Sequence, residues 1–439
     1  MYLYSTKNAS TRVSLKHAVM TGLPEDNGLY MPENIHPLPA EFFEKLPDYS
    51  FPQLSYEVCK HLFEDALTDK LISEDELCEI VNNTITFDAP IISLDEETHI
   101  QELFHGPSLA FKDFGARFMA GLMGYFARQD QEKLVILVAT SGDTGGAVAA
   151  GFLGTPDIEV VILYPSGKVS HLQEKQLTTL GQNITALEID GTFDDCQKLV
   201  KTAFLDKELT GAIKLTSANS INIARLIPQS LYYFRAYQKL EDKSVPVVFS
   251  IPSGNFGNLT AGLLAQRMGL PIAKFIAATN VNDVVPQYLQ SGEFSPKPSV
   301  QTISNAMDVG NPSNFARMQD LFESDWQDMC RLIEGFAYDD QQTRDAMQEI
   351  YDTYKYVMDP HGAVGYLALR QFQEHYPNCQ GVILETAHPS KFLDVVEPVI
   401  KKKVDIPTRL SELADKKKES VEMDVDYQAF KQFLQKNYS

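Results

Sequence analysis

The middle of the chain alternates short apolar runs with segments of helical periodicity. Residues 134–138 are all apolar and mostly β-branched, as expected for a strand that is buried on both faces of a sheet. The same pattern predicts further strands at residues 158–163, 184–189, 245–251, 272–278 and 381–385. Helices are predicted at residues 115–126, 171–180, 193–205 (with Cys196, Leu199, Val200 and Ala203 on one face) and from residue 259 onward. Strands that alternate with helices in this way indicate βαβ units, an α/β fold and mostly parallel sheets.

The charge and the cysteines narrow the class of protein. The 439-residue sequence carries 38 Lys and Arg against 59 Asp and Glu, a net charge of −21 at pH 7. Such a chain does not have the basic composition that favours binding to nucleic acid or to anionic lipid. Its five cysteines are scattered and form no CxxC motif, which favours a reducing compartment. Because we find neither a signal segment nor a long apolar stretch, we expect a cytoplasmic protein.

Two glycine-rich turns lie where a predicted strand meets a predicted helix. The first is Ser141-Gly142-Asp143-Thr144-Gly145-Gly146, and the second is Ser253-Gly254-Asn255-Phe256-Gly257-Asn258. Unpaired N–H groups at a helix N-terminus favour an anion, and the carboxyl ends of parallel strands are the usual ligand site of such sheets. Each turn could be a simple tight connection, but two of this composition favour binding of phosphate or carboxylate. Neither matches the dinucleotide fingerprint or the phosphate loop of nucleotide-binding proteins, so a nicotinamide or ATP enzyme is not indicated.

Lys112 lies among apolar and small residues in the segment 105–117, where a turn is expected to lead into a helix. A desolvated lysine at such a place has a lowered pKa, as a Schiff-base amine requires. Taken alone, Lys112 is better explained as a surface lysine with a buried stem. The balance reverses because Lys112 is followed, in order, by the two glycine-rich turns.

Together these three elements resemble the fold type II family of pyridoxal-phosphate enzymes, and within it the threonine synthases of the bacterial and fungal class. The resemblance extends from Tyr4-Ser5-Thr6 and Gly28-Leu29-Tyr30-Met31-Pro32 to Glu385-Thr386-Ala387-His388-Pro389. It implies an α/β fold like that of the tryptophan synthase β subunit, with two open, mostly parallel sheets flanked by helices.

Within this fold we expect a large cofactor-binding domain and a small α/β domain. The large domain would comprise residues 96–130 and 240–405, and the small one residues 131–239. Residues 1–95 would pack on the large domain, and residues 312–358 would form a helical insertion. The charge-rich C-terminal tail, residues 406–439, is expected to be solvated or frayed.

The resemblance assigns a role to each motif. Lys112 would form the Schiff base with pyridoxal 5'-phosphate, and the Thr386 hydroxyl would meet the pyridine nitrogen. The cofactor phosphate would bind the second turn, which comprises Ser253, Gly254, Asn255, Phe256, Gly257 and Asn258. The substrate carboxylate would bind the first turn and the residue before it, which comprise Thr140, Ser141, Gly142, Asp143 and Thr144. The role of Asp143 stays open, because an ionised carboxylate cannot donate a hydrogen bond.

The segment Asn219-Ser220-Ile221-Asn222-Ile223-Ala224-Arg225 matches the family's element for the substrate phosphate. Arg225 offers two parallel donors, and Ser220 and Asn222 would add others. Without the other motifs, a capped helix with a surface arginine would explain this segment better. Lys168 is a weaker second cation that is better explained as a turn lysine, and His105 and His388 are better explained as structural histidines. No residues have the spacing of metal ligands.

The function that the resemblance implies is conversion of O-phospho-L-homoserine and water to L-threonine and inorganic phosphate, the last step of threonine biosynthesis. The small-molecule substrate would be bound by a monomer, with no nucleic-acid or membrane partner. An alternative with the same cofactor is a phospholyase or a serine or threonine dehydratase, and a dehydratase would release a 2-oxo acid and ammonia. A more remote alternative is a non-catalytic scaffold on the same fold.

Overall fold

The computed structural model describes residues 1–439, which separate into two compact units. Unit 1 consists of Met1 and residues 31–111 and 226–405, whereas unit 2 consists of residues 2–30, 112–225 and 406–439. Each unit is therefore assembled from segments that are distant in sequence. The small domain expected at residues 131–239 overlaps the central part of unit 2, which also includes residues 2–30 and 406–439.

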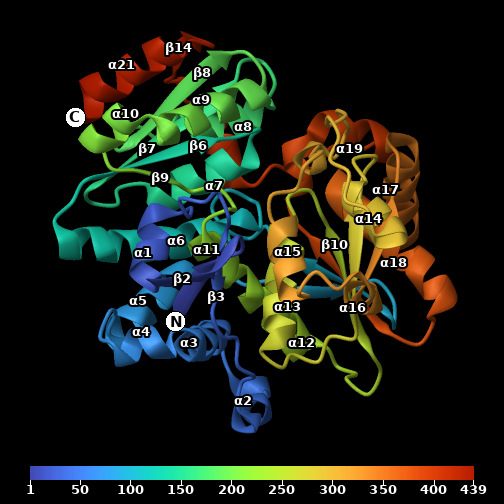
Figure 1. The fold of residues 1–439 in the computed structure, drawn as a ribbon. Coiled ribbons are helices and arrows are strands. Elements are labelled where there is room, and N and C mark those ends of the chain that lie inside the picture. Colours follow the sequence, from blue (N-terminus) through green and yellow to red (C-terminus); the bar gives the residue numbers. More distant parts are fainter. The chain divides into compact units, whose positions relative to one another are not determined.

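Unit 1 is built around a six-stranded sheet in the order β12-β11-β10-β13-β5-β4. Its strands are β4 (Ile91–Ser93), β5 (Thr98–Glu102), β10 (Val247–Pro252), β11 (Lys274–Thr279), β12 (Ile333–Ala337) and β13 (Gln380–Glu385). All neighbouring pairs are parallel except β4 with β5. Every residue of β10 and β13 is buried, because helices flank this sheet (Figure 1). The strands predicted near residues 245, 272 and 381 are confirmed.

Helices of unit 1 precede the sheet, connect its strands and follow it. They are α2 (Ala40–Lys45), η1 (Leu46–Asp48), α3 (Phe51–Leu62), α4 (Glu64–Thr68), α5 (Glu74–Thr84), η2 (Ile227–Ser230), α12 (Leu231–Lys239), α13 (Gly257–Arg267), α14 (Val284–Ser291), η3 (Asn305–Met307), α15 (Phe315–Leu321), α16 (Trp326–Leu332), α17 (Asp340–Tyr354), α18 (Pro360–His375), η4 (Pro389–Phe392) and α19 (Leu393–Ile400). α18 packs on β10, β11 and β13. Buried side chains such as Ile276, Val364 and Ile383 form the core between them.

Unit 2 contains a five-stranded sheet in the order β14-β8-β7-β6-β9, in which all pairs are parallel. Its strands are β6 (Leu134–Ala139), β7 (Ile158–Pro165), β8 (Ile184–Asp190), β9 (Leu215–Ser217) and β14 (Val421–Asp424). β6 is buried along its whole length, as its apolar run predicts. The sequence pattern misses β9 and β14, which are short.

The remaining elements of unit 2 lie on and beside this sheet. They are β1 (Tyr2–Ser5), β2 (Asn8–Ser14), α1 (Leu15–Thr21), α6 (Lys112–Asp130), α7 (Asp143–Phe152), α8 (His171–Thr178), α9 (Phe193–Leu205), α10 (Lys207–Ala212), α11 (Ile223–Leu226), α20 (Thr408–Ala414) and α21 (Tyr427–Tyr438); β3 (Tyr30–Pro32) and the end of α11 lie at the boundaries with unit 1. α9 has the predicted bounds and buries the predicted face. α6 begins earlier than predicted, so that Lys112 occupies its first turn.

The C-terminal tail is folded and not frayed, whereas its charged run at residues 415–419 is largely exposed, as expected for a solvated surface. The tail forms α20, β14 and α21, and β14 adds a strand to the sheet next to β8 (Figure 1). Phe430 and Leu434 of α21 are fully buried in the core of unit 2. The charged run connects α20 to β14 and does not reflect the rest of the tail. Its Lys418 pairs with Glu174 and Glu188.

Residues 312–358, expected as a helical insertion, contribute a strand to the unit 1 sheet. Between α16 and α17 they contain β12, which lies at one edge of the unit 1 sheet and pairs with β11. The pattern Ile-Glu-Gly-Phe-Ala has too little apolar alternation to mark a strand by itself.

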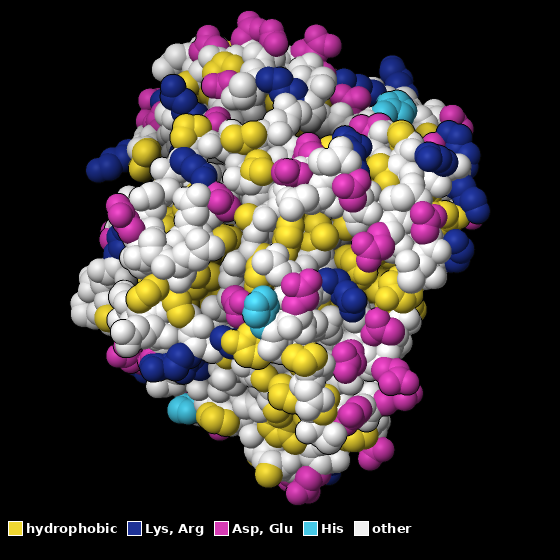
Figure 2. Space-filling view, turned by 90° about the vertical axis from the view of Figure 1, so that its right-hand side faces the viewer, with side chains coloured by type: hydrophobic (Ala, Val, Ile, Leu, Met, Phe, Trp, Pro, Cys, Tyr) yellow, Lys and Arg dark blue, Asp and Glu magenta, His cyan; other side chains and the backbone are white.

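The surface is mixed in character. On the face shown in Figure 2, acidic and basic side chains are interspersed. None of the helices combines the length and the apolar composition that a membrane span requires.

Candidate active site

Lys112 lies next to the first glycine-rich turn in unit 2. Its side chain is 18% exposed, and its Nζ atom lies 3.9 Å from Oδ2 of Asp143, the first residue of α7. Partial burial disfavours the charged amine, whereas a neighbouring carboxylate favours it. The fold therefore brings together two of the motifs that the sequence singles out.

The first turn presents unused donors around this pair. The Thr140 hydroxyl accepts hydrogen bonds from the N–H groups of Gly142 (3.0 Å) and Gly145 (2.8 Å), so Thr140 holds the shape of the turn. The hydroxyl and backbone N–H groups of the half-buried Ser141 and Thr144 have no partner within the chain. Ser141 and Thr144 are thus available to a carboxylate, as the sequence predicts for this turn.

Asp143 is held in place by a residue that sequence reasoning misses. Gln173 of α8 donates from Nε2 to Oδ1 of Asp143 at 2.9 Å, and both side chains are buried. Gly142, with φ +135°, leaves room for this contact, because a Cβ there would lie 2.6 Å from the Gln173 amide. The spacing of Ser170 and Gln173 indicates a capping box, which α8 has, but it does not reveal the contact with Asp143.

The side chain of Asn222, expected at the substrate phosphate, is hydrogen-bonded within unit 2. Its Nδ2 donates to the carbonyl groups of Val19 (3.0 Å) and Ser217 (3.4 Å), and its Oδ1 accepts from the N–H of Ala224 (3.0 Å). Both amide hydrogens are used within unit 2, so Asn222 holds the loop before α11 and has no donor left for a substrate. Ser220 in the same loop is half-buried.

Arg225 lies against the helix that begins with Lys112. Its side chain is buried, and its Nη1 donates to the carbonyl of Ala218 at 2.7 Å. A Cβ on Gly115 of α6 would lie 2.9 Å from Nε of Arg225, so only glycine permits this approach. Burial lowers the pKa of Arg225 to about 10, against the effect of the nearby Asp113 carboxylate, and Arg225 keeps its charge at neutral pH.

Two further arginines lie near the same buried carboxylate. Burial lowers the pKa of Arg117 and of Arg409, and Asp113 opposes the shift in both. Near the first turn of α6, four cations (Lys112, Arg117, Arg225, Arg409) thus accompany two carboxylates (Asp113, Asp143). In a chain with a net charge of −21, this local excess suits a phosphate group. Arg409 is not apparent from the sequence, because it comes from the tail.

In unit 1, the second glycine-rich turn connects β10 to α13. The backbone N–H groups of residues 254–259 have no acceptor within the chain. Phe256 takes a left-handed conformation, with φ +59°, immediately before α13 begins. Six consecutive free N–H groups at the N-terminus of an 11-residue helix form a site for an anion such as phosphate.

The side chains of this turn hold its shape. The Ser253 hydroxyl donates to the carbonyl of Ile251 at 2.8 Å. Asn258 accepts at Oδ1 from the hydroxyl groups of Tyr232 (2.7 Å) and Tyr233 (2.8 Å). Burial raises the pKa of both tyrosines well above the usual range, so they remain donors. Their contribution is not apparent from the sequence, where they form part of an apolar helix.

Thr386 follows the last residue of β13 in unit 1. It is buried, and its carbonyl accepts from the N–H of Phe111 at 2.9 Å. Its hydroxyl has no hydrogen-bond partner within the chain, so it is available to a ligand.

The other polar residues considered in the sequence have local roles. His105 contacts Glu102 at 2.8 Å, and His388 caps η4 by accepting from the N–H of Ser390. These bonds fit the structural role expected for both histidines, which stays a prediction. Lys168 is exposed in the turn after β7.

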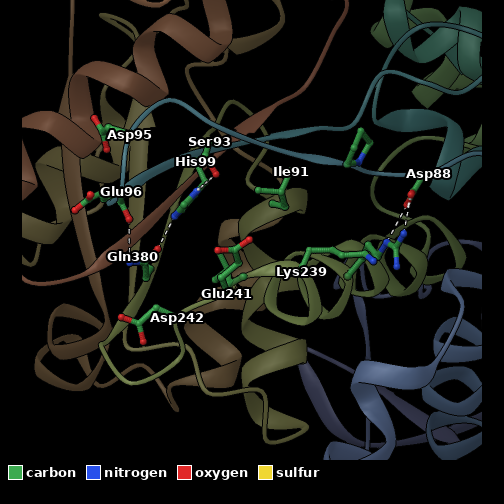
Figure 3. Close-up of a pocket in the computed structure, with 13 residues that line it drawn as sticks. Asp88, Ile91, Ser93, Asp95, Glu96, His99, Lys239, Glu241, Asp242 and Gln380 are labelled. Carbon is green, nitrogen blue, oxygen red and sulfur yellow. Dashed lines mark hydrogen bonds and ion pairs between the residues drawn. The ribbon is translucent and has the colours of Figure 1, made fainter.

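A separate pocket in unit 1, with a volume of about 720 Å³, contains none of the motif residues (Figure 3). Arg235 in it makes a bidentate pair with Asp88, and both ring nitrogens of His99 are bonded, to Ser93 and to Gln380. Because these groups already satisfy one another, the pocket is a weaker candidate than the motif residues.

Comparison with known families identifies the class of protein. The model of the pyridoxal-phosphate dependent enzymes matches residues 79–384. The chain therefore belongs to this class, and its α/β fold with parallel sheets is that of the fold type II enzymes.

Further comparisons narrow the class. The models of the threonine synthase N terminus and C-terminal part match residues 2–85 and 362–434. Threonine synthase of Escherichia coli is 43% identical over 436 residues, which are 99% of each chain. Its crystal structure superposes with a TM-score of 0.91 over 99% of this chain and 100% of that one. A pyridoxal-phosphate-bound threonine synthase from Brucella melitensis, 33% identical, gives 0.91 over 99% of both chains. The chain is a member of the threonine synthase family. It is a pyridoxal-phosphate-dependent lyase.

The residues of each unit fit this cofactor. Unit 2 supplies a partly buried lysine at the start of a helix, and unit 1 supplies a row of unpaired amides and an unpaired threonine hydroxyl. Taken unit by unit, an amine can form a Schiff base with an aldehyde, and free amides at a helix N-terminus can bind a phosphate.

Proposed function

We propose that the chain converts O-phospho-L-homoserine and water to L-threonine and inorganic phosphate. The observation that carries this proposal is the proximity of Lys112 to Asp143 at 3.9 Å, next to a buried arginine that suits a phosphate leaving group. The identity with curated threonine synthases over the whole chain supports the same reaction.

In this proposal Lys112 is the base and the acid. Pyridoxal phosphate, when bound, supplies the electron sink for the negative charge that develops at Cα of the substrate. The Lys112 amine removes the Cα proton and later returns it. Asp143, held by Gln173, stabilises the ammonium form of Lys112 between these two steps. This gives Asp143 a role that needs no hydrogen-bond donor.

Other residues bind the substrate and the cofactor. Ser141 and Thr144 donate to the substrate carboxylate. Arg225, with Ser220, holds the phosphate group, which leaves from Cγ as a proton leaves Cβ. Water then adds its hydroxyl group at Cβ, and Cγ takes up a proton to become the methyl group of threonine. The N–H groups of residues 254–259 hold the cofactor phosphate, and the Thr386 hydroxyl meets the ring nitrogen without protonating it.

The test is a product assay with O-phospho-L-homoserine on the cofactor-loaded protein. We expect phosphate and threonine in equal amounts, whereas a dehydratase would produce a 2-oxo acid and ammonia. Lys112→Ala should reduce turnover by at least about 10³-fold, because it removes the amine that lies 3.9 Å from Asp143 and serves as base and acid in this proposal.

Lys168→Ala is the matched control, because it removes an exposed lysine of unit 2 and should leave turnover unchanged. In the same assay, Arg225→Ala should lose activity that Arg225→Lys does not fully restore, because lysine lacks the two parallel donors. Full turnover of Lys112→Ala would refute the role of Lys112. A 2-oxo acid as the main product would refute the reaction.

We also propose that the protein is a cytoplasmic monomer. All five cysteines are free, which suits a reducing compartment. The exposed large apolar side chains, such as Leu205 and Val300, are dispersed along the chain and form no obvious stripe. Light scattering coupled to gel filtration would test the monomer.

A further inference from the structure

A network of three buried polar side chains in unit 1 has no role in the reaction described above. Asp359, the N-cap of α18, is completely buried and accepts at Oδ1 from the N–H (2.7 Å) and from Nδ1 (2.5 Å) of His361. Glu385, the last residue of β13, is also completely buried and accepts at Oε1 from the N–H of Asp359 (2.8 Å). These contacts define the Glu385–Asp359–His361 network.

The hydrogen bonds of His361 determine its tautomer. Nε2 accepts from the N–H of Ala306 at 3.2 Å, so Nε2 carries a lone pair and Nδ1 carries the hydrogen that Asp359 accepts. His361 therefore links Asp359, through Nδ1, to η3, through Nε2. His361 is only 2% exposed, so both bonds lie in the interior of unit 1.

At the other end of the network, two carboxyl groups face each other. Oε2 of Glu385 and Oδ2 of Asp359 are both buried without a donor. Burial and the neighbouring Asp359 raise the pKa of Glu385 well above its usual range, and one proton between the two groups would satisfy both. Gly362 makes room for this pair, because a Cβ there would overlap Oε2 of Glu385.

His361 contacts η3, and η3 in turn packs against the second glycine-rich turn (residues 253–258). A Cβ on Gly254 would lie 2.8 Å from the carbonyl oxygen of Ala306 and 2.9 Å from Cα of Met307, so η3 packs directly against the turn. The bond from the N–H of Ala306 to His361 fixes η3 from the opposite side. Since the turn binds through backbone N–H groups, its affinity for an anion depends on their exact placement.

We propose that His361, oriented by Asp359 and Glu385, is a positioning residue that holds η3 against the Gly254 turn and so fixes the amides that bind the cofactor phosphate. This inference rests on the assignment of residues 253–258 to that phosphate. It predicts that loss of the bond to Ala306 weakens the phosphate interaction selectively.

The test is the affinity of the full-length apoprotein for pyridoxal 5'-phosphate and for pyridoxal, which lacks the phosphate, measured by absorbance titration. His361→Asn keeps a donor near Nδ1 but loses the acceptor for Ala306. His361→Gln keeps an acceptor near Nε2 and loses the donor to Asp359. We expect the Kd for pyridoxal phosphate to rise about tenfold in His361→Asn and less than about threefold in His361→Gln, because a buried N–H is left unpaired only in the former.

The Kd for pyridoxal should stay within about twofold of the wild-type value in both variants. His375→Gln, at the exposed end of the same helix, is the matched control and should change neither affinity. An equal loss for both ligands, or no loss in His361→Asn, would overturn the proposal. If His361→Asn does not fold, His361→Ala at reduced temperature supplies the same comparison of the two ligands.

Gly254→Ala separates this proposal from the assignment on which it rests. Its added methyl group displaces η3 or the turn, so it should weaken pyridoxal phosphate binding whatever His361 does. If Gly254→Ala binds pyridoxal phosphate normally, the assignment of residues 253–258 to the cofactor phosphate is refuted. If Gly254→Ala binds pyridoxal phosphate weakly and His361→Asn binds it normally, only the role of His361 is refuted.

Discussion

At the scale of single residues, close approaches to glycine mark the sites where polar side chains meet. Gly142 makes room for Gln173 beside Asp143, and Gly115 makes room for Arg225 beside α6. Gly362 makes room for Glu385, which has no counter-charge among its nearest partners. In each case the missing side chain allows a buried polar contact that a methyl group would prevent.

Gly362→Ala should lower the free energy of unfolding by about 3 kcal/mol, because the new methyl group overlaps Oε2 of Glu385 in a closely packed core. Glu385→Ala removes the atom that the methyl group would strike. Adding Gly362→Ala to Glu385→Ala should therefore cost much less free energy of unfolding than adding it to the wild-type protein. Urea unfolding of the four proteins measures the coupling between the two sites. Additive effects would show that the two residues do not compete for space.

At the scale of elements, the C-terminal segment is integral to unit 2. β14 extends the sheet beside β8 (Figure 1). Lys431 of α21 pairs with Asp206 at 2.8 Å and with Glu208 at 2.7 Å. These surface pairs contribute little to stability, whereas burial of Phe430 and Leu434 contributes most of what holds α21 in place. The same segment carries Arg409 to the neighbourhood of Asp113.

Phe430→Ala should destabilise unit 2 by about 3–5 kcal/mol, because it removes a fully buried aromatic ring and leaves a cavity. Gln432→Ala, exposed on the same helix, should change stability by less than about 0.5 kcal/mol. Thermal unfolding with a probe in unit 2 checks both values. An equal, small effect in the two variants would mean that α21 does not contribute to the stability of the unit.

At the scale of the whole molecule, burial sets the chemistry of the thiols. Cys59, Cys196 and Cys379 are buried, and burial raises the pKa of Cys196 to about 12 and that of Cys379 to about 11. Burial raises the pKa of Cys59 as well. Only Cys78 and Cys330 are partly accessible, and Cys330 donates to the carbonyl of Leu289. A thiol reacts as the thiolate, so the three buried cysteines are unreactive.

The native protein should therefore release two equivalents of thionitrobenzoate or fewer with Ellman's reagent on the time scale of minutes, with Cys78 fastest. The unfolded protein should release five, because no disulfide is present. Cys78→Ser should remove the fast phase. Rapid reaction of three or more thiols in the native protein would show that at least one buried cysteine becomes exposed by local unfolding.

How much the sequence predicts depends on how local the signal is. The βαβ pattern, the bounds of α9 and the strands β6, β7, β8, β10, β11 and β13 follow from periodicity that each segment carries by itself. Lys112, the two glycine-rich turns and Thr386 follow from motifs a few residues long. The edge strands β4, β9, β12 and β14 are missed because they bury too little of either face to carry a pattern. The strands β1, β2, β3 and β5 are missed as well.

The amino-acid sequence alone thus determined the α/β class, the order of the chemical motifs and the enzyme family that they define. Only the tertiary structure placed Gln173 on Asp143, Arg409 near Asp113, and His361 between Asp359 and η3. It also showed that Asn222 holds its own loop and that the charged tail is folded. The physical reason is that periodicity and turn chemistry are properties of neighbouring residues, whereas the partner of a buried polar group is chosen by the packing of distant segments.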